Sequence, residues 1–193
     1  MQYPEAKQHI ISRLEAELPK ELTYHSIHHV YDVCDAAIRI AESEGIGGDD
    51  LTLIKTAAMY HDSGFIIQSK NHEEISCDIA ADALPQFGYT KEQINIICGM
   101  IRATKIPQQP QNLMEQIISD ADLDYLGRDD FYSIGDTLFT ELRFYGFIKT
   151  REEWDKVQVN FLQQHHFFTN TAKATRQKKK QAYLHELIKK TKS

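Results

Sequence analysis

Residues 57–64 read AAMYHDSG and set a histidine and an aspartate at the end of an apolar helical stripe. Ile54, Ala57 and His61 recur at helical spacing, so the His61 side chain is predicted to face inward. Asp62 lies one residue further round, beside the same stripe. A carboxylate directed into a core requires a partner, because burying it unpaired costs several kcal/mol.

Two further polar residues interrupt apolar helical faces elsewhere in the chain. His29 begins one such face and Asp122 lies within another. Two imidazoles and two carboxylates that converge on one cation would avoid the cost of burying each group alone. We therefore predict a metal site formed by three helices, with His29, His61, Asp62 and Asp122 as ligands. The two apolar faces consist of Val33, Ala36, Ala37 and Ile40, and of Met114, Ile117, Ile118, Ala121 and Tyr125.

Each of these positions also has a simpler interpretation. A single histidine on an apolar helical face is more often a hydrogen-bonded core residue than a metal ligand. The recurrence of four residues of ligand type, each in an apolar setting, favours the metal site over four independent core groups.

Three segments in the same order resemble the HD-domain superfamily of metal-dependent phosphohydrolases. They are YHSIHH at 24–29, AAMYHDSG at 57–64 and SDADLD at 119–124, and the similarity extends from about residue 24 to 130. The resemblance implies an all-helical bundle that binds a divalent metal through one histidine, a His-Asp pair and a distant aspartate. Carried over residue by residue, these ligands are His29, His61, Asp62 and Asp122.

The remaining pattern is a run of helices separated by short turns, with almost no alternating strand pattern. We expect an all-α fold, an HD-domain helical bundle of about eight or nine helices. A single domain should span residues 1–193, with a metal-binding core at about 24–130 and C-terminal helices at about 131–193. We expect a first helix that ends near Pro19, a second at 24–45, a third from an N-cap at Asp49-Asp50 to about 64, and two more at 73–87 and 91–103. A further helix contains Asp122, the next runs from Asp129 or Asp130 to 145, another covers 152–167, and a basic helix ends the chain.

The catalytic candidates are His25, His72 and the ligand Asp62. The Tyr-His-x-x-x-His segment that ends at His29 resembles that of cyclic-nucleotide phosphodiesterases, which implies that His25 protonates the leaving oxygen. His72 resembles the additional histidine of two-metal family members. Thr104 occupies the region where their further histidine is expected, so we predict one tightly bound metal, with a second possible near His72. Both histidines could equally be surface residues at helix starts.

A phosphate substrate also requires positive side chains. Each candidate could instead be a solvated surface charge. Asp120 and Asp124 fall on the helical face opposite Asp122, which argues against a calcium-binding loop. The candidate substrate-binding residues are Lys70, Arg102, Lys105 and Arg128.

Composition limits the possible partners. A net charge of −6 disfavours a broad nucleic-acid surface. No apolar run approaches the ~20 residues that span a bilayer, and the first residues lack the pattern of a signal peptide, so we expect a cytoplasmic protein without a membrane partner. We interpret Cys34, Cys77 and Cys98 as reduced core residues. A basic terminal segment, predicted as an amphipathic helix with a solvated basic face, contains Lys173, Arg176, Lys178, Lys179, Lys180, Lys189, Lys190 and Lys192.

The predicted function is therefore that of a metal-dependent phosphohydrolase or phosphodiesterase. Its substrate would be a phosphate ester of a nucleotide, a cyclic nucleotide or a related small molecule. Mixed nitrogen and oxygen ligands suit Mn, Fe, Zn, Co or Ni, and Mg also remains open. Two alternatives stay open: a catalytically degenerate HD domain that binds a nucleotide or acts as a regulatory module, and an HD-fold diiron oxygenase.

Overall fold

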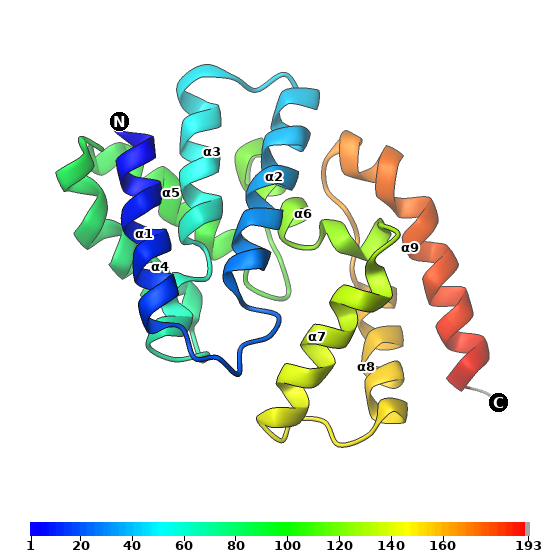
Figure 1. Ribbon diagram of the computed structural model, residues 1–193. Helices are drawn as coiled ribbons and strands as arrows, with labels where there is room; N and C mark the ends of the chain where they lie inside the picture. The colour runs from blue at the N-terminus through cyan, green and yellow to red at the C-terminus, as the bar shows by residue number, and fades with distance from the viewer. Residues whose placement is uncertain (192–193) are drawn as a thin grey trace.

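The computed structural model describes residues 1–191, which form nine α-helices and three short 3-10 helices without a β-strand (Figure 1). This confirms the expected all-α fold. The α-helices are α1 (Tyr3–Glu17), α2 (Ile27–Ser43), α3 (Gly48–Tyr60), α4 (His72–Ala83), α5 (Lys91–Ala103), α6 (Leu113–Asp122), α7 (Phe131–Phe144), α8 (Arg151–Gln164) and α9 (Asn170–Thr191). The 3-10 helices are η1 (Ser63–Ile66), η2 (Leu84–Phe87) and η3 (Asp124–Gly127).

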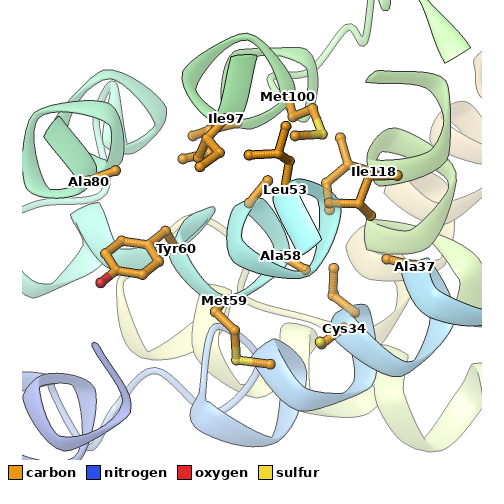
Figure 2. Close-up of a cluster of buried hydrophobic side chains, with 14 of the residues drawn as sticks. Cys34, Ala37, Leu53, Ala58, Met59, Tyr60, Ala80, Ile97, Met100 and Ile118 are labelled. Carbon is orange, nitrogen blue, oxygen red and sulfur yellow. The ribbon is translucent and has the colours of Figure 1, made fainter. Parts of the chain in front are cut away.

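Helix α3 lies at the centre of the N-terminal bundle. It packs against α1, α2, α4, α5 and α6, and its side chains are apolar on nearly every side. Figure 2 shows Leu53, Ala58 and Met59 of α3 among Cys34 of α2 and Met100 of α5. Because apolar burial is worth roughly 25 cal/mol per Å², this packing fixes the position of the helix end that carries the His-Asp pair.

The C-terminal helices build a second apolar cluster. Tyr24, η3 and helices α7, α8 and α9 contribute to it. Phe131 of α7 stacks on Tyr183 of α9 with ring centroids 4.5 Å apart. Figure 1 shows α9 running along the outer side of this half of the molecule. Because Tyr24 precedes α2 and belongs to this cluster, the two halves meet beside the predicted metal ligands.

Asp124 anchors α9 to the rest of the structure. Its side chain is 2% exposed, and Oδ1 lies 2.8 Å from both the Arg39 Nη2 and the Arg176 Nε atoms. Arg128 Nη1 lies 3.6 Å from Oδ2. A buried carboxylate requires such partners, so these ion pairs join α2, η3 and α9.

Helix α2 begins three residues later than the sequence predicts. The expected start was Tyr24, and the first helical residue is Ile27. The backbone amides of Tyr24 and His25 donate instead to the Glu141 carboxylate of α7, at 2.9 and 3.1 Å. This long-range contact holds the preceding segment in a non-helical conformation.

Other predicted helix ends shift for local reasons. The N-cap of α3 is Gly47 rather than Asp49 or Asp50, which lie in the first turn. Asp130 is the N-cap residue of α7 but provides no side-chain cap. The helix expected to reach residue 87 ends at 83 and continues as η2, whose second residue is a proline.

The basic terminal segment is helical but does not have one solvated face. Lys180 is 2% exposed, and its ammonium group donates to the His165 carbonyl oxygen. Burial lowers the pKa of Lys180 to about 8. Arg176 is held by Asp124, and Lys192 lies outside the described residues. None of the helices within residues 1–191 is long and apolar enough to cross a membrane.

We predict that Asp124→Asn destabilises the fold by about 2 kcal/mol, because it removes the buried charge that pairs with the partly exposed guanidinium groups of Arg39 and Arg176. Chemical denaturation should show a lower midpoint for the variant. The matched control is Asp129→Asn, because Asp129 pairs with Lys179 but its side chain is 96% exposed. That control should change stability by less than about 0.5 kcal/mol. Equal stability of the two variants would contradict the anchoring role of Asp124.

Candidate metal centre and active-site cavity

Four predicted ligands converge from three helices. His29 lies in the first turn of α2, Asp122 ends α6, and His61 and Asp62 follow the last residue of α3. The apolar stripes predicted from the sequence are buried, and they orient these side chains towards one point. His29, His61 and Asp62 are each less than one-tenth exposed.

The distances among these groups are those of a compact ligand cluster. Ligand atoms of His29, His61 and Asp122 all lie within 4.8 Å of one another. Asp122 Oδ1 is 3.1 Å from His29 Nε2 and 3.6 Å from His61 Nε2. Asp62 Oδ2 is 3.6 and 3.3 Å from the same two nitrogen atoms. One cation could therefore contact two imidazoles and two carboxylates.

Two atoms of this cluster indicate that a cation fits. His61 Nδ1 lies 2.8 Å from the Ala58 carbonyl oxygen, which can only accept, so Nδ1 keeps its proton and Nε2 is the ring nitrogen that can bind a cation once its own proton is released. His61 Nε2 and Asp62 Oδ2 are both buried and lack a hydrogen-bond partner among the described residues. A divalent ion is a ligand that both atoms could bind at once.

Burial and neighbouring charges shift the pKa values of this cluster in opposite directions. Burial raises the pKa of Asp122, but the hydrogen bond with His29 and the nearby His61 imidazole outweigh it and lower that pKa to about 2. Burial also raises the pKa of Asp62, whereas His61 holds it well below its ordinary value. Burial lowers the pKa of His61, and the two carboxylates hold it well above its ordinary value. The carboxylates are therefore ionised, which favours a bound cation.

His25 is held in place beside the cluster. Its Nδ1 atom lies 2.5 Å from Glu141 Oε1, and its ring stacks on Phe65 with centroids 4.1 Å apart. Burial raises the pKa of Glu141, but the hydrogen bond and charge of His25 outweigh this and lower it. An ionised Glu141 accepts the Nδ1 proton, so the Nε2 atom of His25 remains available for chemistry.

His72 reaches the other oxygen of Asp62. Its Nδ1 atom donates to the Ser69 carbonyl oxygen at 3.1 Å, which leaves Nε2 3.4 Å from Asp62 Oδ1. Gly64 allows this approach, because a Cβ atom there would overlap the His72 backbone. Thr104 lines the nearby cavity and donates its hydroxyl proton to a helical carbonyl.

Of the four positively charged residues predicted to bind substrate, one lines the cavity and three do not. Lys105 lines the cavity beside the metal ligands. Arg102 instead pairs with Glu74 at 2.9 Å on the surface. Arg128 is held by Asp32 and Asp130. Lys70 is exposed and lies outside the cavity lining.

Sequence reasoning missed Glu141. This residue lies three positions after Leu138, on the apolar face of α7, and is 3% exposed. The argument that identified Asp122, a carboxylate within an apolar helical face, could have identified it. Its partner His25 is too distant in sequence for any local pattern to reveal.

A cavity of about 450 Å³ opens beside the ligand cluster. This volume lies in the range of small-molecule sites. His25, Asp62, His72 and Asp122 line one part of it, and apolar side chains of α7 and α8 line the rest. The cluster is therefore accessible to a small ligand.

Comparison with known proteins agrees with this geometry. The family model for the HD domain matches residues 26–124, just over half of the chain. The chain therefore belongs to the HD-domain family. No curated protein sequence matches it.

Two solved structures share the fold. A crystal structure of a protein from Lactobacillus plantarum superposes with a TM-score of 0.71 at 20% identity, covering 100% of this chain and 97% of the other. A crystal structure of a predicted HD superfamily hydrolase from an uncultured Thermotogales bacterium gives a TM-score of 0.62 at 20% identity, with coverage of 95% and 89%. The fold therefore extends over the C-terminal helices as well as the matched domain.

We predict that His61→Ala and Asp122→Ala each reduce bound metal at least about tenfold, because each removes a ligand from the cluster. Elemental analysis of purified protein after dialysis against Mn²⁺ measures this. His28→Ala is the matched control, since His28 is adjacent to His29 but exposed, and it should retain the metal content of the unchanged protein. Unchanged metal content in Asp122→Ala would refute the ligand assignment.

Proposed function

We propose that the protein is a metal-dependent phosphohydrolase that cleaves a phosphate ester of a small molecule within the 450 Å³ cavity. Nucleotides, cyclic nucleotides and related esters form the substrate class. One observation carries the proposal: unpartnered ligand atoms of His61 and Asp62 are buried beside a histidine that a carboxylate orients towards the same cavity.

The chain's own residues hold the ion. His29, His61, Asp62 and Asp122 are the ligands, and their mixed nitrogen and oxygen donors suit Mn, Fe, Co, Ni, Zn or Mg. When bound, the ion supplies positive charge against the phosphoryl oxygens and lowers the pKa of water. A second, weaker ion would bind at His72, Asp62 Oδ1 and Glu73, whose Oε1 lies 3.8 Å from His72 Nε2.

His25 is the general acid of this reaction. Water adds to phosphorus, the bond between phosphorus and the leaving oxygen breaks, and that oxygen takes the proton from His25 Nε2. The added water releases one proton to solvent, and His25 regains a proton from solvent before the next turnover. Glu141 fixes the tautomer by accepting the Nδ1 proton at 2.5 Å, and stacking on Phe65 fixes the ring plane. Glu141 is thus a positioning residue, because it acts through His25.

Lys105 and His72 of the cavity bind the phosphate. Lys105 contributes a positive charge that can pair with a phosphoryl oxygen. His72 is held by Ser69, so that its Nε2 atom faces the cavity beside Asp62. These two groups orient the ester for in-line attack by water.

The direct test is a panel of phosphate monoesters and diesters assayed with Mn²⁺, Mg²⁺, Co²⁺, Fe²⁺, Ni²⁺ or Zn²⁺ added to metal-free protein. We expect metal-dependent release of phosphate or cleavage of the diester for at least one compound. Absence of hydrolysis with every ion would overturn the proposal. Metal binding without turnover would favour a regulatory module, and oxygen consumption by a two-iron form would favour an oxygenase.

We predict that His25→Ala lowers kcat by ~100-fold or more while bound metal is retained, because the leaving oxygen loses its proton donor. Glu141→Gln should lower kcat by ~10-fold with an unchanged KM, since the amide cannot stabilise a protonated His25. Glu141→Asp should recover part of the activity. His28→Ala again serves as the control for a neighbouring imidazole. Loss of bound metal in His25→Ala would contradict the assignment of His25 as a general acid that does not bind the metal.

A further inference from the structure

The cavity beside the metal centre has two chemically different walls. One wall carries the metal ligands and His25. The other comes from α7 and α8, which pack together through Phe139 and Trp154 with ring centroids 6.3 Å apart. We call this second surface the α7–α8 wall, and its apolar lining residues are Leu138, Leu142, Trp154, Val157 and Phe161.

The cavity offers little positive charge apart from the metal position. Among the described residues, Lys105 is the one lysine or arginine in its lining, while Glu73 adds a further carboxylate to those of Asp62 and Asp122. A polyphosphate chain carries several charges and requires several cationic contacts. A single phosphoryl group requires only the ion and one lysine. The charge distribution therefore favours a substrate with one phosphoryl group.

Gln158 supplies a polar group within the α7–α8 wall. It lines the cavity and is 7% exposed, and its side-chain amide has no hydrogen-bond partner within residues 1–191. The amide atoms are not among the buried unpartnered atoms, so solvent in the cavity reaches them, and a ligand that displaces this water must offer a hydrogen bond in its place. An otherwise apolar ligand with one hydrogen-bonding atom would satisfy Gln158.

We propose that the α7–α8 wall binds the non-reacting part of the substrate. This part is an aromatic or aliphatic group that bears a single phosphoryl group and presents one hydrogen-bonding atom to Gln158. The inference rests on the proposed function, because the phosphoryl group lies at the metal centre. It narrows the substrate class from nucleotides, cyclic nucleotides and related esters to esters with a single phosphoryl group and an aromatic or aliphatic body.

The test compares esters with chemically similar leaving groups. Mn²⁺-loaded protein is assayed with 2-phenylethyl phosphate, ethyl phosphate and glycerol 1-phosphate, which all release a primary alcohol. We expect kcat/KM to be at least about tenfold higher for 2-phenylethyl phosphate, because only its body fills the apolar wall. 2-Phenylethyl diphosphate, with the same body and a longer phosphate chain, should react more slowly than the monophosphate.

Matched variants locate the effect on the wall. Val157 in the wall and Ile96 on α5, outside the cavity lining, are both 44% exposed. Val157→Gln should lower kcat/KM for 2-phenylethyl phosphate about fivefold or more and leave ethyl phosphate within about twofold, whereas Ile96→Gln should change neither. Thermal melting of both variants checks that each one folds. Gln158→Leu should abolish any preference for 2-(4-hydroxyphenyl)ethyl phosphate over 2-phenylethyl phosphate.

The outcomes separate this inference from the proposed function. Equal kcat/KM for the three primary esters would overturn the inference and leave a phosphohydrolase in place. If no ester is hydrolysed with any ion, the proposed function fails, and calorimetry with phosphonates then decides the inference. Binding of 2-phenylethylphosphonate at least about tenfold tighter than ethylphosphonate would support an apolar ligand wall, and equal binding would overturn it.

Discussion

Buried carboxylates impose the strongest constraint on this structure. An ionised carboxylate in a protein interior needs a compensating charge or hydrogen bonds, because desolvation otherwise costs several kcal/mol. Asp62 and Asp122 meet this requirement beside the imidazoles of His29 and His61, in an arrangement that suits a cation. Since the four residues come from α2, α3 and α6, the same requirement joins three helices at one point.

The same constraint connects the C-terminal helices to this centre. Glu141 of α7 accepts hydrogen bonds from the backbone amides of residues 24 and 25 and from the His25 side chain. Asp124 holds Arg176 of α9, and Asp120 accepts hydrogen bonds from the backbone of residues 168 and 169. Each buried carboxylate thus forms a cross-link between distant segments. The Glu141 contacts place α7 at one side of the cavity, and the Asp120 contacts hold the segment that follows α8.

The ligand cluster and the α7–α8 wall offer different kinds of contact to a ligand in the cavity. The ligand cluster, His25 and Lys105 concentrate the charged chemistry at one part of the cavity. The α7–α8 wall offers apolar area and one amide, which can select the body of a ligand without acting on the bond that breaks. Under the proposed function, the ligand cluster would define the reaction and the C-terminal helices would select its substrate.

The sequence by itself determined the all-helical fold and the convergence of His29, His61 and Asp122, because helical periodicity and the resemblance to the HD family both depend on local spacing. Helix boundaries near Tyr24 and the role of Glu141 were not predictable, since they depend on a contact more than one hundred residues apart in the chain. Periodicity likewise could not tell which cations face the cavity. Tertiary structure decided that Lys105 lines it while carboxylates hold Arg102 and Arg128, because ion pairing depends on proximity in space rather than order in sequence.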